Sequence, residues 1–258
     1  MAVSAAPSPL PDRAPEAKAG AAAVYEFGNG VRVHRADLMA VQLQRYAMDG
    51  NPNLHEPVEE EWMLRAFATD PPARPVFLDI GAAVGYYAIL IKSRWPTARV
   101  IAVDALTRHL AALRANAALN GLPDDALETL EVAVGPGEAV RSFVDIGFGS
   151  AFAEATPAAR RPGARLLDVR TRPLSALLAG LPTVHLMKMD IQGAELEVLA
   201  AARAELAAGR VRQALVGTHG KALHAGVRSL LQDCGFRILF DDPAPAMQPD
   251  GIVLARHG

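Results

Sequence analysis

The stretch "FLDIGAAVGYY", residues 77–87, decides how this chain folds. An apolar run containing Asp79 ends at Ile80, small residues follow from Gly81 to Ala83, and a helix is expected from about residue 85. Two explanations account for a turn that carries so few side chains. Either neighbouring backbone packs closely against it, or a nucleotide-like ligand lies there.

From residue 76 onward, apolar strand candidates alternate with helical segments. The predicted strands are residues 76–80, 99–104, 127–134, 184–190, 212–218, 236–242 and 251–257. The predicted helices are residues 85–94, 107–120, 172–180, 193–208 and 221–234. This alternation is typical of an α/β fold, a doubly wound parallel sheet with helices on both faces. The last two strands are joined by a Pro-rich loop too short for a crossover helix, so we expect the final strand to be antiparallel.

The chain before this alternation divides into two parts. Residues 1–23 are rich in Ala and Pro without apolar periodicity, which predicts a disordered tail. Residues 24–71 predict a hairpin around Gly28-Asn29-Gly30 and helices at 37–50 and 57–68, together a small appendage that we interpret as a helical lid segment. Residues 72–258 form the predicted ligand-binding domain, interrupted at 138–152 by an additional strand candidate and a Gly-rich turn.

Composition narrows the function. The net charge of −2 and the sequence pI near 6.4 argue against a nucleic-acid partner. The single cysteine, Cys234, lies in an apolar context, so we expect a buried thiol and no internal disulfide. No apolar run is long enough to span a bilayer, and the N-terminus lacks a signal-like apolar core, so we expect a cytoplasmic protein. The oligomeric state stays open, a homodimer included.

The loop after Asp79 distinguishes between two classes of ligand. A dinucleotide site requires G-x-G-x-x-G, but Ala83 replaces the second Gly and the large Tyr86 replaces the third. S-adenosylmethionine carries an ammonium and a ribose diol, so an acid before the loop and another at the end of the next strand are useful. Asp79 and Asp104 occupy those two places. Because NAD sites share the second acid, a nicotinamide-dependent oxidoreductase stays as an alternative.

With these residues placed, the sequence resembles the FkbM-type family of class I methyltransferases over roughly residues 53–258. The stretches that carry the resemblance are "FLDIGAAVGYYAIL", "VIAVDA", "EVAVG" and "LMKMDIQGAELEVL". The resemblance implies a seven-stranded, mostly parallel Rossmann-like sheet and S-adenosylmethionine as cofactor. It also implies methyl transfer to a hydroxyl of a small molecule, such as a sugar, a glycan or a polyketide-like natural product.

The resemblance also implies which residues bind the cofactor. They are Glu56, Asp79, Gly81, Ala82, Ala83, Gly85, Tyr86, Asp104, Ala105, Ala133, Val134 and Asp190. Ala133 and Val134 end the third core strand, where the adenine is expected, and Glu56 is expected near the methionine end. A side chain at Gly81 is expected to occupy the cofactor's space.

The acceptor side departs from the family pattern. Gln192 and Gly217 stand where the family often has glutamates, so a cofactor-binding scaffold without catalysis stays as an alternative. His219 and Asp190 follow the fifth and fourth strands, and we predict His219 as the general base because an ordinary histidine titrates near neutral pH. One Asp and one His make a thin ligand set for a hard cation, so we predict no required metal.

Overall fold

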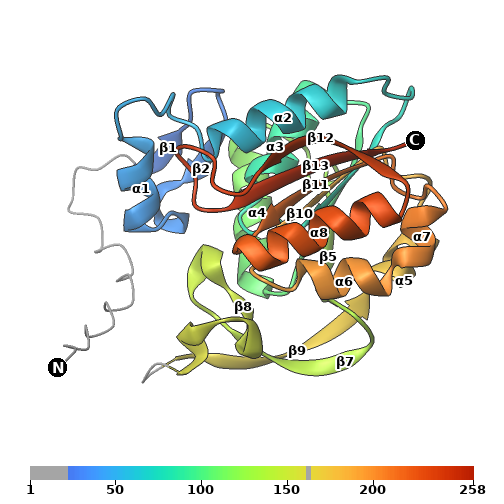
Figure 1. Cartoon of the computed structure of the whole chain (residues 1–258). Coiled ribbons are helices and arrows are strands. Elements are labelled where there is room, and N and C mark those ends of the chain that lie inside the picture. The colour runs from blue at the N-terminus through green and yellow to red at the C-terminus, as the bar shows by residue number, and fades with distance from the viewer. Residues whose placement is uncertain (1–22, 161–163) are drawn as a thin grey trace.

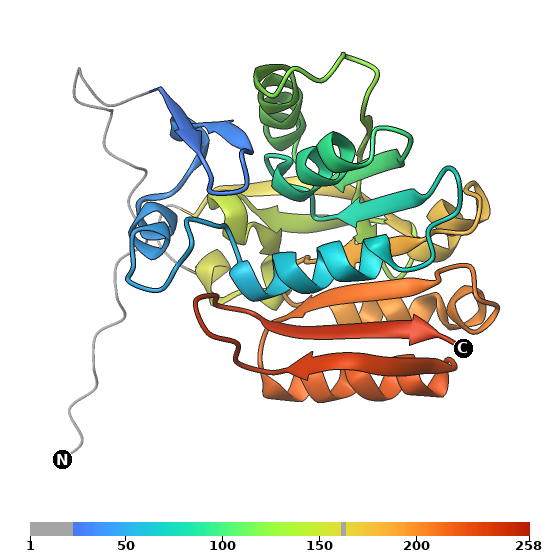
Figure 2. The ribbon, with the colours of Figure 1, turned by 90° about the horizontal axis from the view of Figure 1, so that it is seen from above.

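The computed structural model describes residues 23–160 and 164–258, so the predicted tail, apart from Ala23, lies outside the described residues. A seven-stranded sheet forms the centre, in the order β12-β13-β11-β10-β3-β4-β5. Its strands are β3 (Val76–Ile80), β4 (Arg99–Asp104), β5 (Glu128–Glu131), β10 (Leu186–Met189), β11 (Gln213–Thr218), β12 (Phe236–Asp242) and β13 (Gly251–His257). The doubly wound α/β fold predicted from the sequence is confirmed (Figures 1 and 2).

The predicted reversal of the last strand is also confirmed. β13 pairs antiparallel with both β11 and β12, whereas β3, β4, β5, β10 and β11 pair in parallel. Gly251 lies opposite Thr218 in the β11–β13 register. A Cβ on Gly251 would lie 2.7 Å from Thr218 Oγ1, so only glycine lets the start of β13 come this close to the end of β11.

Helices cover both faces of the sheet. They are α2 (Pro57–Ala68), α3 (Tyr86–Arg94), α4 (Thr107–Leu119), α5 (Leu174–Ala179), α6 (Glu195–Ala201), α7 (Arg203–Ala207) and α8 (Lys221–Asp233). One apolar core lies under α2, α3 and α4, and the other lies under α5, α6 and α8 (Figure 2). The helix predicted over 193–208 is divided at Ala202, whose side chain is fully buried. Cys234 is buried, as expected.

A second, four-stranded sheet corrects the prediction between residues 127 and 173. Its strands, in the order β6-β9-β7-β8, are β6 (Ala133–Gly135), β7 (Ala139–Val144), β8 (Ala151–Phe152) and β9 (Leu166–Pro173). The strand predicted over 127–134 is in fact two, because the chain leaves the main sheet after β5 and pairs with β9 from Ala133. The sequence did not predict β9, in which only Val169 and Thr171 are buried, so its apolar signal is weak. Short 3-10 turns lie at Gly147–Gly149, Ala153–Ala155 and Pro157–Arg160.

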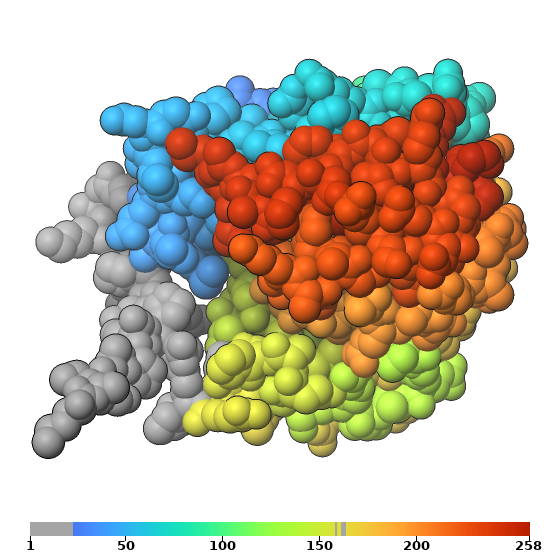
Figure 3. Space-filling model, viewed as in Figure 1, coloured from blue at the N-terminus to red at the C-terminus, as the bar shows by residue number. Residues whose placement is uncertain are grey.

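The N-terminal appendage packs against the main domain. It contains the predicted hairpin, β1 (Val24–Glu26) and β2 (Arg32–His34), a 3-10 turn at Arg35–Asp37, and α1 (Ala40–Tyr46), which is shorter than predicted. The side chain of Asn116 on α4 accepts the His34 N–H at 2.8 Å and donates to the Val84 carbonyl at 3.1 Å. The appendage lies above the segment around β8 at one end of the molecule (Figure 3). In the described chain, no helix combines the length and the apolar character that crossing a membrane requires.

Candidate functional site

A pocket lies beyond the carboxyl ends of β3, β4 and β10, where open α/β sheets bind ligands. Seven of the predicted residues line it: Gly81, Ala83, Asp104, Ala105, Ala133, Val134 and Asp190. The sequence did not predict the other lining residues, which include His109, Phe143, Phe148, Phe152 and Gln192. The three phenylalanines come from the second sheet and its turn, which close one side of the pocket with apolar surface. No local motif indicates them, because their position depends on the unpredicted pairing of β7 with β9.

Asp104 anchors the loop at the base of the pocket. Its Oδ2 accepts the Ala83 N–H at 2.9 Å, and its Oδ1 accepts the Leu106 N–H at 2.9 Å. His109 Nδ1 lies 2.9 Å from the same Oδ1. Because Oδ1 already faces two nitrogen atoms and Oδ2 accepts only one N–H, Oδ2 retains the capacity to accept a further donor. Its orientation is therefore fixed before any ligand binds.

The small residues of the loop are explained first by packing. Gly81 has φ +84°, and a Cβ on it would lie 1.9 Å from the Asp190 carbonyl oxygen. Gly85 has φ +90°, and a Cβ there would meet the Leu113 side chain at 2.6 Å. A side chain at Gly81 would first strike the backbone after β10, so packing already requires glycine here; that it would also occupy the ligand's space stays a prediction.

Four predicted cofactor residues lie outside the pocket lining and hold the appendage or the loop. The Tyr86 hydroxyl donates to Glu60 Oε2 at 2.5 Å and accepts from Asn29 Nδ2 at 2.9 Å. Gly85 precedes α3 and donates its N–H to the Ala82 carbonyl at 2.9 Å. Glu56 is buried, and its Oε2 accepts the Tyr87 hydroxyl at 2.9 Å.

Asp79, the fifth predicted residue outside the lining, is fully buried. Neither carboxylate oxygen has a hydrogen bond of good geometry among the described residues, although the Ala88 N–H lies near enough to lower the pKa of Asp79 slightly. Burial raises the pKa of Asp79 to about 6, and Asp190 and Asp104 add to this rise against the pull of Lys188. An orphaned buried carboxylate is costly unless a donor or cation reaches it. A ligand that carries an ammonium group fits this requirement.

A buried charge network continues from Asp79 across the same face of the sheet. Lys188 lies opposite Asp79 in the β3–β10 register, and its Nζ is 3.2 Å from Glu59 Oε1 and 3.9 Å from Asp190 Oδ2. Burial alone would lower the pKa of Lys188, but Glu59, Asp190, Asp79 and Glu56 raise it above its usual value. Lys188 is therefore a permanent buried cation.

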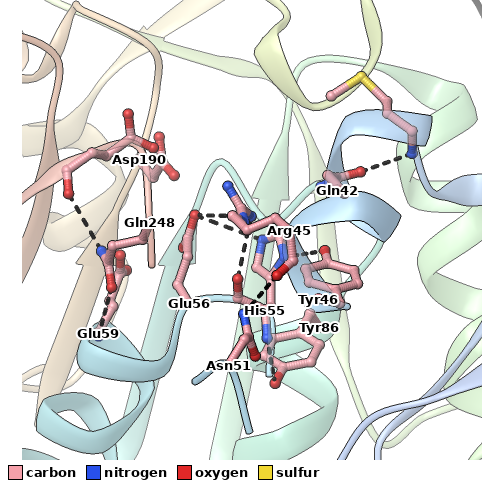
Figure 4. Close-up of polar contacts among 12 residues, drawn as sticks. Gln42, Arg45, Tyr46, Asn51, His55, Glu56, Glu59, Tyr86, Asp190 and Gln248 are labelled. Atoms are coloured by element: carbon pink, nitrogen blue, oxygen red, sulfur yellow. Dashed lines mark hydrogen bonds and ion pairs between the residues drawn. The ribbon is translucent and has the colours of Figure 1, made fainter. Parts of the chain in front are cut away.

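Glu59 lies in the first turn of α2, and Glu56 is the residue before that helix; Figure 4 shows both together with Asp190. Burial raises the pKa of Glu59 to about 8 despite Lys188, and Glu56 and Asp190 contribute to the rise. Glu56 also lies 3.8 Å from Arg45 and 3.9 Å from the His55 ring. The network thus contains more carboxylates than cations.

His219 lies among three carboxylates. Its Nε2 is 3.1 Å from Asp250 Oδ1 and 3.6 Å from Asp190 Oδ1, and its Nδ1 is 3.2 Å from Glu195 Oε1. Burial alone would lower the pKa of His219, but Asp250, Glu195 and Asp190 raise it to about 11. The reason for predicting His219 as a base, an ordinary pKa near neutrality, is therefore wrong. Among these carboxylates its ring holds a proton at neutral pH.

Comparison with known proteins agrees with this architecture. A crystal structure of methyltransferase FkbM from Methylobacillus flagellatus KT has a TM-score of 0.51 and 16% identity, covering 71% of this chain and 44% of that chain. The chain thus spans less than half of that structure. The delta-N METTL16 MTase domain has a TM-score of 0.50 and 13% identity, covering 80% of this chain and 84% of that chain. The fold is that of the class I methyltransferases.

The sequence comparisons define the family. Residues 79–238 match the methyltransferase FkbM domain, so the chain belongs to the FkbM methyltransferase family. A curated relative, methyltransferase sdnD of Sordaria araneosa, is 29% identical over 218 residues, which is 72% of this chain and 83% of the relative. This chain is accordingly a methyltransferase, and its methyl donor is S-adenosylmethionine.

Proposed function

We propose that this protein methylates a hydroxyl oxygen of a sugar, a glycan or a polyketide-like natural product. The observation that carries the proposal is the position of Asp190. It lines the pocket, and it also lies 3.6 Å from His219 in the cluster of carboxylates beside it. An alcohol loses its proton when its oxygen is methylated, and carboxylates at the methyl side of the pocket are groups that can accept that proton.

The chain's own residues suggest how S-adenosylmethionine would be held. Ala133, Val134 and the pocket phenylalanines supply apolar surface suited to the adenine. Asp104, already oriented by Ala83 and His109, would accept the ribose hydroxyls. Asp79 would accept the ammonium, which supplies the partner that its buried carboxylate lacks. The remaining predicted residues, Ala82, Gly85, Tyr86 and Glu56, would support this site through the loop and the appendage.

The reaction is a displacement at the methyl carbon. The acceptor oxygen forms a bond to the methyl group while the carbon–sulfur bond breaks, and its electron pair returns to sulfur to give neutral S-adenosylhomocysteine. The hydroxyl proton leaves for a carboxylate or for water. Because a sulfonium needs no protonation to leave, the protein's tasks are to align the two reactants and to accept one proton.

The test combines binding with transfer. S-adenosylhomocysteine should raise the melting temperature, and NAD should not, which would exclude the nicotinamide alternative. Incubation with methyl-labelled S-adenosylmethionine and a panel of sugar, glycan and macrolide-like alcohols should label an oxygen that mass spectrometry can locate. Binding of S-adenosylhomocysteine without label transfer to any acceptor would favour the scaffold alternative, and label on nitrogen or carbon would contradict O-methylation.

A further inference from the structure

Three chain segments meet beside the pocket and bring together side chains that the sequence keeps far apart. Asp190 follows β10, His219 follows β11, and Asp250 precedes β13. One potential ligand atom of each residue lies within 4.8 Å of those of the other two. The sequence supplied only the first two, which is why it predicted no metal.

The fold places Asp250 in two ways. Because Thr218 and Gly251 are paired in the antiparallel register, the residues just beyond that pair, His219 and Asp250, come to face each other. In addition, Gln248 joins the loop to α2: its Oε1 accepts the Glu59 N–H at 3.1 Å, and its Nε2 donates to the Asp250 carbonyl at 3.3 Å (Figure 4). Asp250 is thus held by its register and by a side-chain bridge.

The orientation of the His219 ring is set by a fourth residue. Glu195 is fully buried, and its Oε1 accepts the N–H groups of Ile191 at 3.0 Å and Gly193 at 3.2 Å. The same oxygen lies 3.2 Å from His219 Nδ1, and Nε2 faces the two aspartates, although neither ring nitrogen makes a hydrogen bond of good geometry with the described residues. A carboxylate behind one ring nitrogen, with the other nitrogen facing ligand oxygens, is the arrangement of metal-binding histidines.

The charges around this point favour a cation. Asp190, Asp250 and Glu195 face His219. The nearest other cation, Lys188, is 3.9 Å from Asp190 Oδ2 and 3.2 Å from Glu59 Oε1, so it lies on the side of Asp190 toward Glu59. Gln192 donates to Asp190 Oδ1 at 2.9 Å and adds no charge. A divalent ion between Nε2 and the two aspartates would therefore add positive charge where three carboxylates surround one imidazole.

We propose that Asp190, His219 and Asp250 bind a divalent cation of the Mn²⁺ and Mg²⁺ type through two carboxylate oxygens and Nε2, with the proton of Nε2 released to solvent on binding. Oxygen ligands suit both ions, and the single imidazole favours Mn²⁺ over Mg²⁺. Three protein ligands leave positions of an octahedral ion open for water and for an oxygen of the acceptor. Resting on the proposed function, this inference makes the acceptor one whose hydroxyl can coordinate a metal ion, held on the side of Asp190 that faces the pocket.

The first test measures cation binding without turnover. The full chain, stripped with EDTA, is titrated with Mn²⁺ and free Mn²⁺ is followed by electron paramagnetic resonance. We expect one ion per chain, displaced by excess Mg²⁺. Asp250→Asn should weaken Mn²⁺ binding by about tenfold or more. Asp242→Asn, on the same hairpin but outside the cluster, should leave it unchanged. No binding at millimolar Mn²⁺, or equal binding by wild type and Asp250→Asn, overturns the proposal.

Two further measurements keep the result unambiguous. Circular dichroism and the melting temperature show whether Asp250→Asn is folded, and His219→Gln serves as a second variant that should also lose Mn²⁺. Binding of S-adenosylhomocysteine is measured in parallel. If Mn²⁺ binds while S-adenosylhomocysteine does not, the proposed function fails and the cation site stands. If EDTA-treated protein binds no Mn²⁺ yet transfers methyl groups at the untreated rate, the cation site fails and the function stands.

Discussion

Two halves of the ligand-facing edge of the sheet are built on different principles. The pocket half consists of the loop from Gly81 to Gly85, Asp104 and the phenylalanines of the second sheet. Its polar groups are satisfied by near neighbours, as when Asp104 accepts the N–H groups of Ala83 and Leu106. The charged half consists of Asp79, Lys188, Glu59, Asp190, His219 and Asp250. Its carboxylates outnumber its cations, and Asp79 has no hydrogen bond of good geometry among the described residues.

The difference shows which half needs a ligand to be complete. The pocket half is organised in advance, so binding there requires little rearrangement. The charged half holds excess negative charge in a buried place, and burial raises the pKa of Asp79 and of Glu59. We therefore expect substitutions in the charged half to have larger effects on stability, and substitutions in the pocket half to act mainly on cofactor affinity.

The largest effect is expected from Lys188→Met. The change removes the cation that faces Glu59 and Asp190. Removing one partner of a buried ion pair costs about 3–5 kcal/mol, and protonation of Glu59, whose pKa burial raises to about 8, places the cost at the lower end of that range. The free energy of unfolding in urea at neutral pH measures this cost. Lys221→Met, at an exposed position, should change it by less than about 0.5 kcal/mol. The double variant Lys188→Met/Glu59→Gln should recover part of the loss, and the absence of any recovery would contradict the pairing.

The second largest loss of stability is expected at Gly81, the one residue of the pocket half at which we expect a substitution to act on stability rather than on cofactor affinity. In Gly81→Ala, the new Cβ would overlap the Asp190 carbonyl oxygen at a backbone φ of +84°. We expect a loss of about 3 kcal/mol in the free energy of unfolding, from the steric clash and the left-handed backbone together. Gly121→Ala has a similar φ of +73° with nothing within 4 Å, so it should cost only about 1 kcal/mol. Equal losses in the two variants would show that backbone conformation, and not the approach of β10, explains Gly81.

The same division explains what the sequence could predict. The loop and Asp104 of the pocket half were predictable, because the glycines and Asp104 are close in the chain and follow strands with clear apolar runs, whereas the phenylalanines were not. The seven-stranded sheet and its reversed last strand followed from the same periodicity. The contacts of the charged half could not be predicted, because Glu59 meets Lys188 and Asp250 meets His219 only after folding. The chemistry of His219 was misjudged for this reason: its own residue type suggests a neutral base, but distant carboxylates set its pKa.

A smaller effect is expected on affinity. Asp104→Ala removes the proposed acceptor of the ribose hydroxyls and also the bond that fixes the Ala83 N–H. Hydrogen bonds to a charged group are worth about 1.5–3 kcal/mol each, so binding of S-adenosylhomocysteine should weaken by about tenfold or more. Calorimetric titration measures this change. Glu131→Gln is the control, since Glu131 lies opposite Asp104 at the end of β5 but is exposed outside the pocket. Unchanged affinity in a folded Asp104→Ala protein would refute the role of Asp104.

The smallest effect concerns pH and joins the two halves. In the folded, ligand-free protein the pKa of Asp79 is raised from 3.8 to about 6. An acid whose pKa is raised on folding binds its proton more tightly in the folded state. Its contribution to stability is therefore present below the unfolded pKa and is lost as the pH rises through the folded pKa. The ligand-free protein should accordingly lose stability through Asp79 between about pH 4 and pH 6.

The affinity for the cofactor should rise with pH over the range in which the stability of the ligand-free protein falls. An ammonium group beside Asp79 favours the ionised carboxylate, so affinity for S-adenosylhomocysteine should rise a few-fold between about pH 5 and pH 7, with a proton released on binding. Titration calorimetry in two buffers of different ionisation enthalpy counts that proton.

The Asp79→Asn variant cannot release this proton, so its affinity for S-adenosylhomocysteine should be lower and less dependent on pH. The comparison with Asp79→Asn is needed because burial also raises the pKa of Glu59, to about 8, which adds its own slope above neutrality. If the wild type and Asp79→Asn release the same number of protons near pH 6, then the ammonium does not reach Asp79, and the charged half has another partner.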